Sequence, residues 1–137
     1  MAHKILVIDD DLDIIRLLKK SLSAQLFDVD TATEIEKVHE LIAQNTYSVA
    51  IVDLGLSHPD YTGGLDIVKL IREDHPKTKI LVYTANENPQ VKALALRNGA
   101  DLYLVKPVPL NELSSCVMGL CAGIPATAIS KPKGNRF

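Results

Sequence analysis

The sequence predicts an α/β protein in which five parallel strands form one doubly wound sheet with helices on both faces. Apolar runs of strand length alternate with segments of helical periodicity five times along the chain, which indicates repeated βα units. Four of these runs are rich in Ile, Val and Leu without strict alternation, as expected of parallel strands covered on both faces. Because βαβ crossovers are right-handed, we expect the first and third strands to be neighbours where the winding reverses.

Five short segments have the character of strands. They cover residues 4–9, 27–32, 48–53, 79–84 and 101–105. The second segment alternates polar and apolar residues more than the others do, so we place it nearer an edge of the sheet.

The first three helices are expected between these strands. The second begins with Thr33 and Glu36, which have the spacing of a capping box. The third covers residues 65–74 and ends before Pro76. The apolar residues expected to face the sheet are Ile14, Ile15, Leu18 and Leu22 in the first helix and Ile35, Val38 and Ile42 in the second.

The last two helices have recognisable ends. In the fourth, we expect Asn88 as the N-cap, Pro89 at the first helical position and Gly99 after the last turn. The fifth begins near Pro109. Its buried residues are expected to be Leu110, Leu113, Val117 and Leu120.

Length, composition and charge indicate one soluble domain. The chain has 137 residues, of which 47% are hydrophobic and 23% charged. A net charge of -2 argues against direct nucleic-acid binding, and the sequence has neither a signal segment nor an apolar run long enough to span a membrane. We therefore expect a cytoplasmic domain over residues 1–121, with no membrane partner, and a flexible tail or the start of a linker over residues 122–137.

Charged and polar side chains stand at the carboxyl ends of four expected strands. The first strand ends in Asp9-Asp10-Asp11, the third in Asp53, the fourth in Thr84 and the fifth in Lys106-Pro107. Any one of these residues is explained by helix capping or a solvated charge, but the combination at one sheet edge indicates a functional site. Converging carboxylates repel one another, and a divalent cation with hard oxygen ligands, such as Mg²⁺, would remove that repulsion.

These motifs resemble those of response-regulator receiver domains over about residues 4–120. The motifs are Asp9-Asp10 after KILVI, Asp53 ending VAIVD, Gly63-Gly64-Leu65 before the third helix, Thr84-Ala85 after KILVY, and Lys106-Pro107 after LYLV. The resemblance implies a flavodoxin-like (βα)5 fold with strand order 2-1-3-4-5. We expect a stand-alone receiver that resembles the chemotaxis-type single-domain regulators.

The resemblance also implies a role for each site residue. Asp53 would accept a phosphoryl group from a sensor histidine kinase or a phosphotransfer protein. Asp9, Asp10, Asp53 and the backbone carbonyl of Gly55 would hold Mg²⁺. Lys106, Thr84 and the backbone of Ala85 would contact the phosphoryl oxygens.

The resemblance also implies a cis peptide bond before Pro107. Signalling would follow from a conformational switch that involves Thr84 and Tyr103. The surface of the fourth helix, fifth strand and fifth helix would then bind a downstream protein target or an output domain. The chain would be a phosphoacceptor and not an enzyme, either monomeric or dimerising on phosphorylation.

Two departures from the family pattern concern the segment after the acceptor. The loop from Leu54 to Gly63 is longer than usual, and its residues His58, Asp60 and Tyr61 either reshape partner access or form an indifferent surface insertion. Gly55 has no side chain at a position that tunes the lifetime of the acyl phosphate in the family.

Other functions fit the sequence less well. A haloacid-dehalogenase-like phosphatase would need a late acidic pair, but the only acidic residue after Lys106 is Glu112. A flavodoxin-like nucleotide or flavin binder would need a phosphate loop where three aspartates stand, and an EF-hand would need Gly and Glu where Ile14 and Lys20 stand. A phosphate-independent interaction module with the same fold is the closest alternative.

Overall fold

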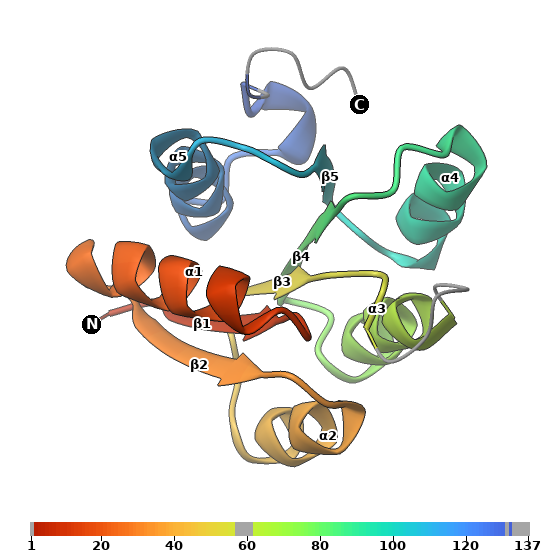
Figure 1. Ribbon diagram of the computed structural model, residues 1–137, viewed down its shortest axis with the longest axis horizontal. Helices are drawn as coiled ribbons and strands as arrows, with labels where there is room; N and C mark the ends of the chain where they lie inside the picture. The colour runs from red at the N-terminus through yellow and green to blue at the C-terminus, as the bar shows by residue number, and fades with distance from the viewer. Residues whose placement is uncertain (1, 57–61, 131, 133–137) are drawn as a thin grey trace.

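The computed structural model describes residues 2–56, 62–130 and 132. Five parallel strands form one sheet in the order β2-β1-β3-β4-β5, with helices on both faces (Figure 1). The predicted fold class and strand order are confirmed, and β2 lies at an edge as expected. The strands are β1 (Lys4–Ile8), β2 (Asp28–Ala32), β3 (Val49–Val52), β4 (Lys79–Thr84) and β5 (Leu102–Val105).

The helices alternate with the strands along the chain. They are α1 (Leu12–Ala24), α2 (Ile35–Gln44), α3 (Thr62–Asp74), α4 (Pro89–Asn98), α5 (Leu110–Cys121) and the short 3-10 helix η1 (Ala126–Ala128). In the described part of the chain, no helix combines the length and the apolar character that crossing a bilayer requires.

Two apolar layers hold the helices against the sheet. Helices α2, α3 and α4 contribute to the cluster on one face, and α1 and α5 contribute to the cluster on the other. The interior strand β1 supplies both clusters alternately: Leu6 and Ile8 belong to the first, and Ile5 and Val7 to the second. Burial on both faces explains why this strand is apolar at every one of these positions.

The ends of α4 agree with the sequence analysis. The Asn88 side chain accepts a hydrogen bond of 2.8 Å from the backbone amide of Gln90, and Pro89 occupies the first turn. Gly99 follows the helix with a φ of 120°, a conformation that favours glycine.

Three local predictions are wrong. The residue at the N-cap of α2 is Glu34, which makes no side-chain capping hydrogen bond, so Thr33 and Glu36 do not form a capping box around Thr33. Helix α3 begins at Thr62, earlier than residue 65. Leu110 is 38% exposed, whereas Leu113, in the same turn of α5, belongs to the buried cluster.

The segment after α5 packs against the domain as far as the structure describes it. Ala126 and Ile129 contact the apolar cluster of α1 and α5, and a Cβ atom on Gly119 would lie 3.4 Å from the Ile129 side chain. The domain boundary expected at residue 121 and the flexibility of the segment after it stay predictions, while the described part of that segment places Ala126 and Ile129 against the domain.

Helix α1 ends in a Schellman motif that has leucine where glycine is usual. The backbone amide of Leu26 donates to Ser23 O and that of Phe27 donates to Leu22 O, which is the pair of bonds that defines this motif. Leu26 has a φ of 68° and is 81% exposed. Its side chain therefore adds backbone strain and gains little burial.

We expect Leu26→Gly to raise the free energy of unfolding by about 0.5–1 kcal/mol, because relief of strain exceeds the added backbone entropy of glycine. Urea denaturation measures the change. As a control, Gln25→Gly changes the neighbouring position, where φ is -98°, and should lower the free energy of unfolding. Equal losses in both variants would contradict the assignment of strain to Leu26.

Candidate functional site

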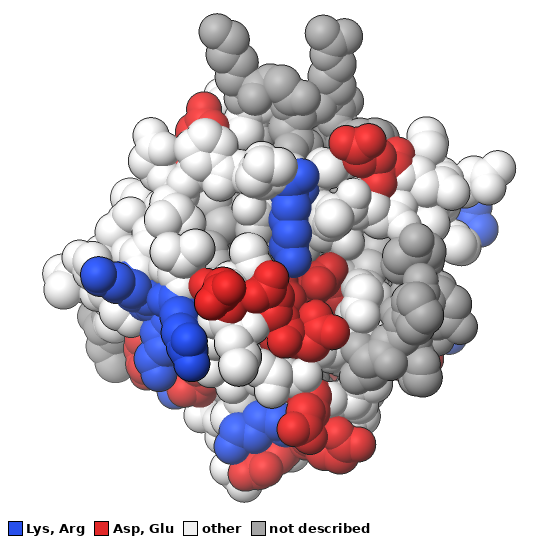
Figure 2. Space-filling model, viewed as in Figure 1, with Lys and Arg blue, Asp and Glu red and all other residues white. Residues whose placement is uncertain are grey.

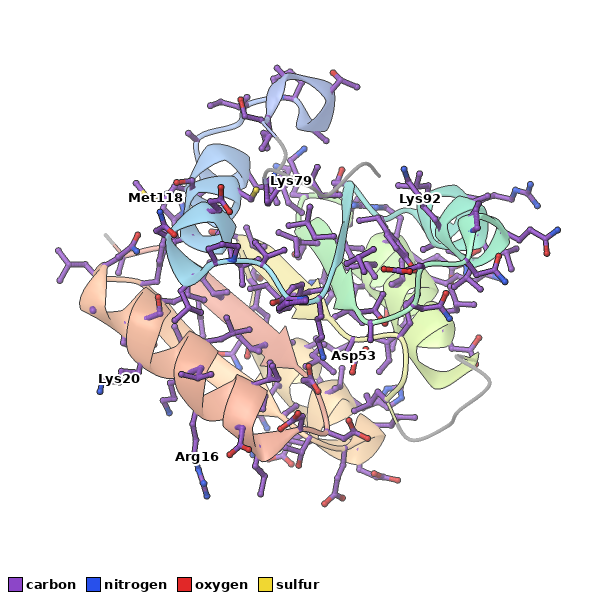
Figure 3. All side chains as sticks on the ribbon, turned by 45° about the horizontal axis from the view of Figure 1, so that its top comes forward. Arg16, Lys20, Asp53, Lys79, Lys92 and Met118 are labelled. Carbon is purple, nitrogen blue, oxygen red and sulfur yellow. The ribbon has the colours of Figure 1, made fainter. Side chains whose placement is uncertain are left out.

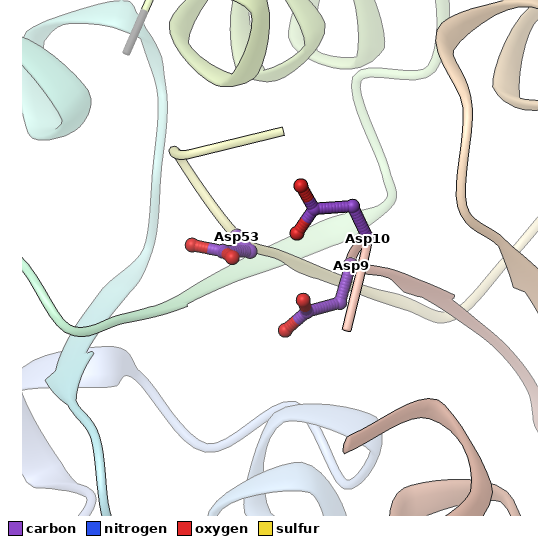
Figure 4. Close-up of side chains that lie close together, drawn as sticks. All are labelled: Asp9, Asp10 and Asp53. Carbon is purple, nitrogen blue, oxygen red and sulfur yellow. The ribbon is translucent and has the colours of Figure 1, made fainter. Parts of the chain in front are cut away.

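Three carboxylates meet at the carboxyl edge of the sheet. Strands β1 and β3 are adjacent with Ile8 paired to Val52, so the residues that follow, Asp9 and Asp53, come side by side. One oxygen each of Asp9, Asp10 and Asp53 lies within 4.8 Å of the others, and the three side chains converge in Figure 4. Acidic side chains also gather near the centre of this face in the space-filling view (Figure 2).

The three aspartates after β1 have different environments. Asp9 is 2% exposed, and its Oδ1 accepts a hydrogen bond of 2.9 Å from the backbone amide of Asp11. Asp10 is exposed and belongs to the carboxylate cluster. Asp11 instead caps α1 by accepting from the amide of Asp13. The cluster is therefore built by Asp9 and Asp10, while Asp11 satisfies a backbone donor of the helix.

A lysine from the far side of the sheet enters this cluster. The backbone amide of Lys106 donates to Thr84 O at 2.8 Å, which keeps Lys106 beside the end of β4. Its Nζ lies 2.7 Å from Asp9 Oδ2 and 3.4 Å from Asp53 Oδ2. Asp53 thus lies where the loops after β1, β3 and β5 meet (Figure 3).

Burial and charge oppose each other at this ion pair. Burial raises the pKa of Asp9, the hydrogen bonds from Lys106 and from the Asp11 amide lower it, and the charge of Asp53 raises it, with a net increase. Burial lowers the pKa of Lys106, but the hydrogen bond to Asp9 and the charges of Asp53 and Asp9 outweigh burial and raise it. Lys106 is therefore a cation that offsets only part of the negative charge.

Thr84 and Tyr103, the two expected switch residues, both contact the loop after β4. Thr84 is 3% exposed, and its hydroxyl oxygen accepts a hydrogen bond of 3.4 Å from the backbone amide of Asn86. The Tyr103 side chain is 1% exposed, and its hydroxyl donates to Asn86 O at 2.8 Å. Ala85 lies between Thr84 and Asn86 and is exposed. Asn86, which no motif in the sequence marks as a site residue, therefore links the two residues.

Several known proteins have sequences similar to this chain. The family model of the response regulator receiver domain matches residues 5–118. The chain belongs to the response regulator receiver family.

The response regulator protein PilR of Pseudomonas aeruginosa is 34% identical to this chain over 115 residues, which are 84% of this chain and 25% of PilR. The transcriptional regulatory protein SrrA of Staphylococcus aureus is 30% identical over 131 residues, 96% of this chain and 53% of SrrA. This receiver domain therefore spans a quarter to about half the length of these relatives.

Solved structures of receiver domains have the same architecture. A two-component response regulator from Clostridium difficile is 31% identical with a TM-score of 0.81, covering 88% of this chain and 96% of that one. The beryllofluoride-activated receiver domain of DrrB, a Thermotoga maritima protein, is 28% identical with a TM-score of 0.79, covering 89% of this chain and 99% of that one.

Three further predictions concern the Lys106-Pro107 peptide bond, the backbone of Gly55 and the lengthened loop after Asp53. The peptide bond between Lys106 and Pro107 is cis, as expected. The backbone amide of Gly55 donates to Asp53 Oδ1 at 3.2 Å, while a metal-binding role for its carbonyl stays a prediction. His58, Asp60 and Tyr61 in the lengthened loop lie outside the described residues.

The raised pKa of Asp9 predicts that the contribution of Asp9 to the stability of this receiver domain falls with rising pH when Mg²⁺ is absent. The folded chain retains the Asp9 proton to higher pH than the unfolded chain does. The resulting stabilisation is fully present below the unfolded pKa of Asp9 and is lost as pH rises through the folded pKa. Ionised carboxylates favour a bound cation, so Mg²⁺ should counteract the loss.

The measurement is the free energy of unfolding of wild type minus that of Asp9→Asn, across the acidic to neutral range with EDTA and with Mg²⁺. In EDTA we expect this difference to fall as pH rises. A difference that is constant or increases with pH in EDTA would contradict the assignment.

Proposed function

We propose that this receiver domain is a phosphorylation switch of a two-component pathway, with Asp53 as the acceptor. The phosphoryl donor is the phosphohistidine of a sensor kinase or of a phosphotransfer protein. The observation that carries the proposal is the placement of the Asp53 carboxylate beside those of Asp9 and Asp10 and within 3.4 Å of the Lys106 ammonium.

The proposed transfer requires a nucleophile and stabilisation of charge. A carboxylate oxygen of Asp53 attacks phosphorus, the phosphorus–nitrogen bond breaks, and the imidazole nitrogen keeps the electron pair and takes up a proton. An acyl phosphate on Asp53 is the product. Lys106 offers positive charge to the phosphoryl oxygens, and Thr84 and the Ala85 backbone offer hydrogen-bond donors. Phosphoryl transfer depends mainly on such positioning and charge stabilisation.

The carboxylate cluster fits Mg²⁺. Asp9, Asp10 and Asp53 offer hard oxygen donors that already lie within 4.8 Å of one another, and Mg²⁺ prefers sites with few protein carboxylates and several waters. In the proposal these residues hold the ion, with the Gly55 carbonyl as a further ligand. When bound, Mg²⁺ neutralises charge on the transferring group.

The switch would act through the loop after β4. Phosphorylation adds charge and acceptor oxygens at Asp53, which draws the Thr84 hydroxyl away from its contact with the Asn86 amide. Because Tyr103 donates to the carbonyl of the same residue, Asn86, this movement would change the bond that holds Tyr103. The surface of α4, β5 and α5 would thereby alter its affinity for a downstream protein or output domain.

In this proposal the chain acts chemically only on its own acyl phosphate and is not an enzyme for other substrates.

Beryllofluoride binding distinguishes the proposed phosphorylation switch from a phosphate-independent interaction module with the same fold. Beryllofluoride imitates the phosphoryl group on an acceptor aspartate, and we expect Mg²⁺-dependent binding with NMR shifts at Thr84, Asn86 and Tyr103. A folded protein that bound Mg²⁺ but gave no beryllofluoride shifts would support the interaction module instead.

A further inference from the structure

Tyr83 stands directly before Thr84 on β4, on the other face of the sheet. It is 5% exposed and belongs to the apolar cluster of α1 and α5. An aliphatic side chain also fills space in this cluster, as Leu81 does two residues earlier on the same face. Two contacts distinguish the tyrosine, and it makes both with the segment that carries Lys106.

One contact comes from the Tyr83 hydroxyl and the other from its ring. The hydroxyl accepts a buried hydrogen bond of 3.0 Å from the backbone amide of Val108. The ring centroid lies 5.6 Å from the Nζ of Lys106, within the range of a cation–π interaction. A single side chain therefore contacts the chain on both sides of Pro107.

The ring contact differs from the ion pairs that Lys106 makes. Asp9 and Asp53 bind its ammonium at 2.7 and 3.4 Å, but a phosphoryl group and a cation at these carboxylates would compete with both bonds. The Tyr83 ring is neutral and takes no part in the carboxylate cluster. It can keep the ammonium beside the site while the charges around Asp53 change.

We propose that Tyr83 is a positioning residue for Lys106, an inference that rests on the proposed phosphoacceptor function. The hydroxyl anchors the backbone after Lys106, and the ring holds the ammonium where the phosphoryl oxygens are expected. Tyr83 is not one of the residues proposed to contact the phosphoryl group or to hold Mg²⁺, so we expect its effect to be confined to the placement of Lys106.

The test uses two substitutions and a matched control. Tyr83→Phe removes the hydroxyl and keeps the ring, and Tyr83→Leu removes both. Tyr47→Phe removes another buried tyrosine hydroxyl, which donates to Asp30 at 2.7 Å at the opposite end of the sheet. For each protein, the dissociation constants of Mg²⁺ alone and of beryllofluoride at saturating Mg²⁺ are measured, with urea denaturation as a check on folding.

We expect beryllofluoride to bind about threefold more weakly to Tyr83→Phe and about tenfold more weakly to Tyr83→Leu, the range that one hydrogen bond and one cation–π contact provide. The affinity for Mg²⁺ should stay unchanged, because the carboxylates that hold it remain. Lys106→Ala, which lacks the ammonium altogether, should lose more beryllofluoride affinity than either Tyr83 variant, while its affinity for Mg²⁺ should rise because the ammonium no longer competes for Asp9 and Asp53. Tyr47→Phe should bind beryllofluoride like wild type.

Wild-type beryllofluoride affinity in both Tyr83 variants would overturn the inference and leave the proposed function intact. Parallel losses of Mg²⁺ and beryllofluoride affinity would also overturn it, since they indicate general loosening of the site. If Tyr83→Leu fails to fold, the comparison of Tyr83→Phe with Tyr47→Phe decides. A wild-type protein that bound no beryllofluoride would overturn the proposed function, and this inference with it.

Discussion

Asp53→Asn is expected to abolish uptake of a phosphoryl group from acetyl phosphate while the protein stays folded. An amide lacks the nucleophilic carboxylate oxygen that forms an acyl phosphate. The fold should persist because the asparagine carbonyl can still accept from the Gly55 amide, a bond of 3.2 Å in the wild type. Loss of one charge from the carboxylate cluster also relieves repulsion in Mg²⁺-free protein.

Phosphate-affinity electrophoresis after incubation with acetyl phosphate and Mg²⁺ measures the uptake. The control is Asp74→Asn, an exposed aspartate at the end of α3, which should be phosphorylated like wild type. Uptake by Asp53→Asn at the wild-type level would show that another residue is the acceptor.

Gly64→Ala is expected to lower the free energy of unfolding by about 3 kcal/mol, toward the upper end of the usual range for overpacking. A Cβ atom on Gly64 would lie 2.4 Å from Leu54 Cα and 2.7 Å from Leu54 O. Both atoms belong to the backbone, so no change of rotamer can relieve the clash. Because Leu54 directly follows Asp53, a shift of its backbone should also weaken beryllofluoride binding.

The matched control for this substitution is Gly119→Ala, which changes another helical glycine. A Cβ atom there would come no closer than 3.4 Å to the flexible Ile129 side chain, and alanine raises helix propensity by up to about 1 kcal/mol. We therefore expect unchanged or increased stability at this position. Urea denaturation of both variants gives the comparison, and equal stability of Gly64→Ala and wild type would contradict the close approach of Gly64 in α3 to the Leu54 backbone.

The placement of the candidate site could be predicted from the sequence because parallel strands bring their carboxyl ends to one edge. Asp9, Asp53, Thr84 and Lys106 all directly follow or end buried strands, so the order of strands determines their proximity. The apolar run of β1 likewise indicates burial on both faces. These features depend on the periodicity of apolar residues and on the alternation of strands and helices, and both can be recognised in the sequence.

Contacts between side chains of distant segments could not be predicted in the same way. The bonds from Tyr83 to Val108 and from Tyr103 to Asn86 depend on where loops turn after a strand, and no spacing in the sequence marks them. Ile129 packs against the domain although its segment has no periodicity. At α2 the capping pattern was present, but the helix begins at Ile35, and Glu34 takes the position before it.

Trapping of the acyl phosphate tests the central claim most directly. The wild-type protein is incubated with acetyl phosphate in Mg²⁺ or in EDTA and then treated with borohydride, which reduces an aspartyl phosphate to homoserine. Mass spectrometry of peptides then identifies the reduced residue. We predict homoserine at position 53 only after incubation with Mg²⁺. Reduction at Asp9 or Asp10, or no reduced residue in a folded protein, would contradict the assignment of Asp53 as the phosphoacceptor.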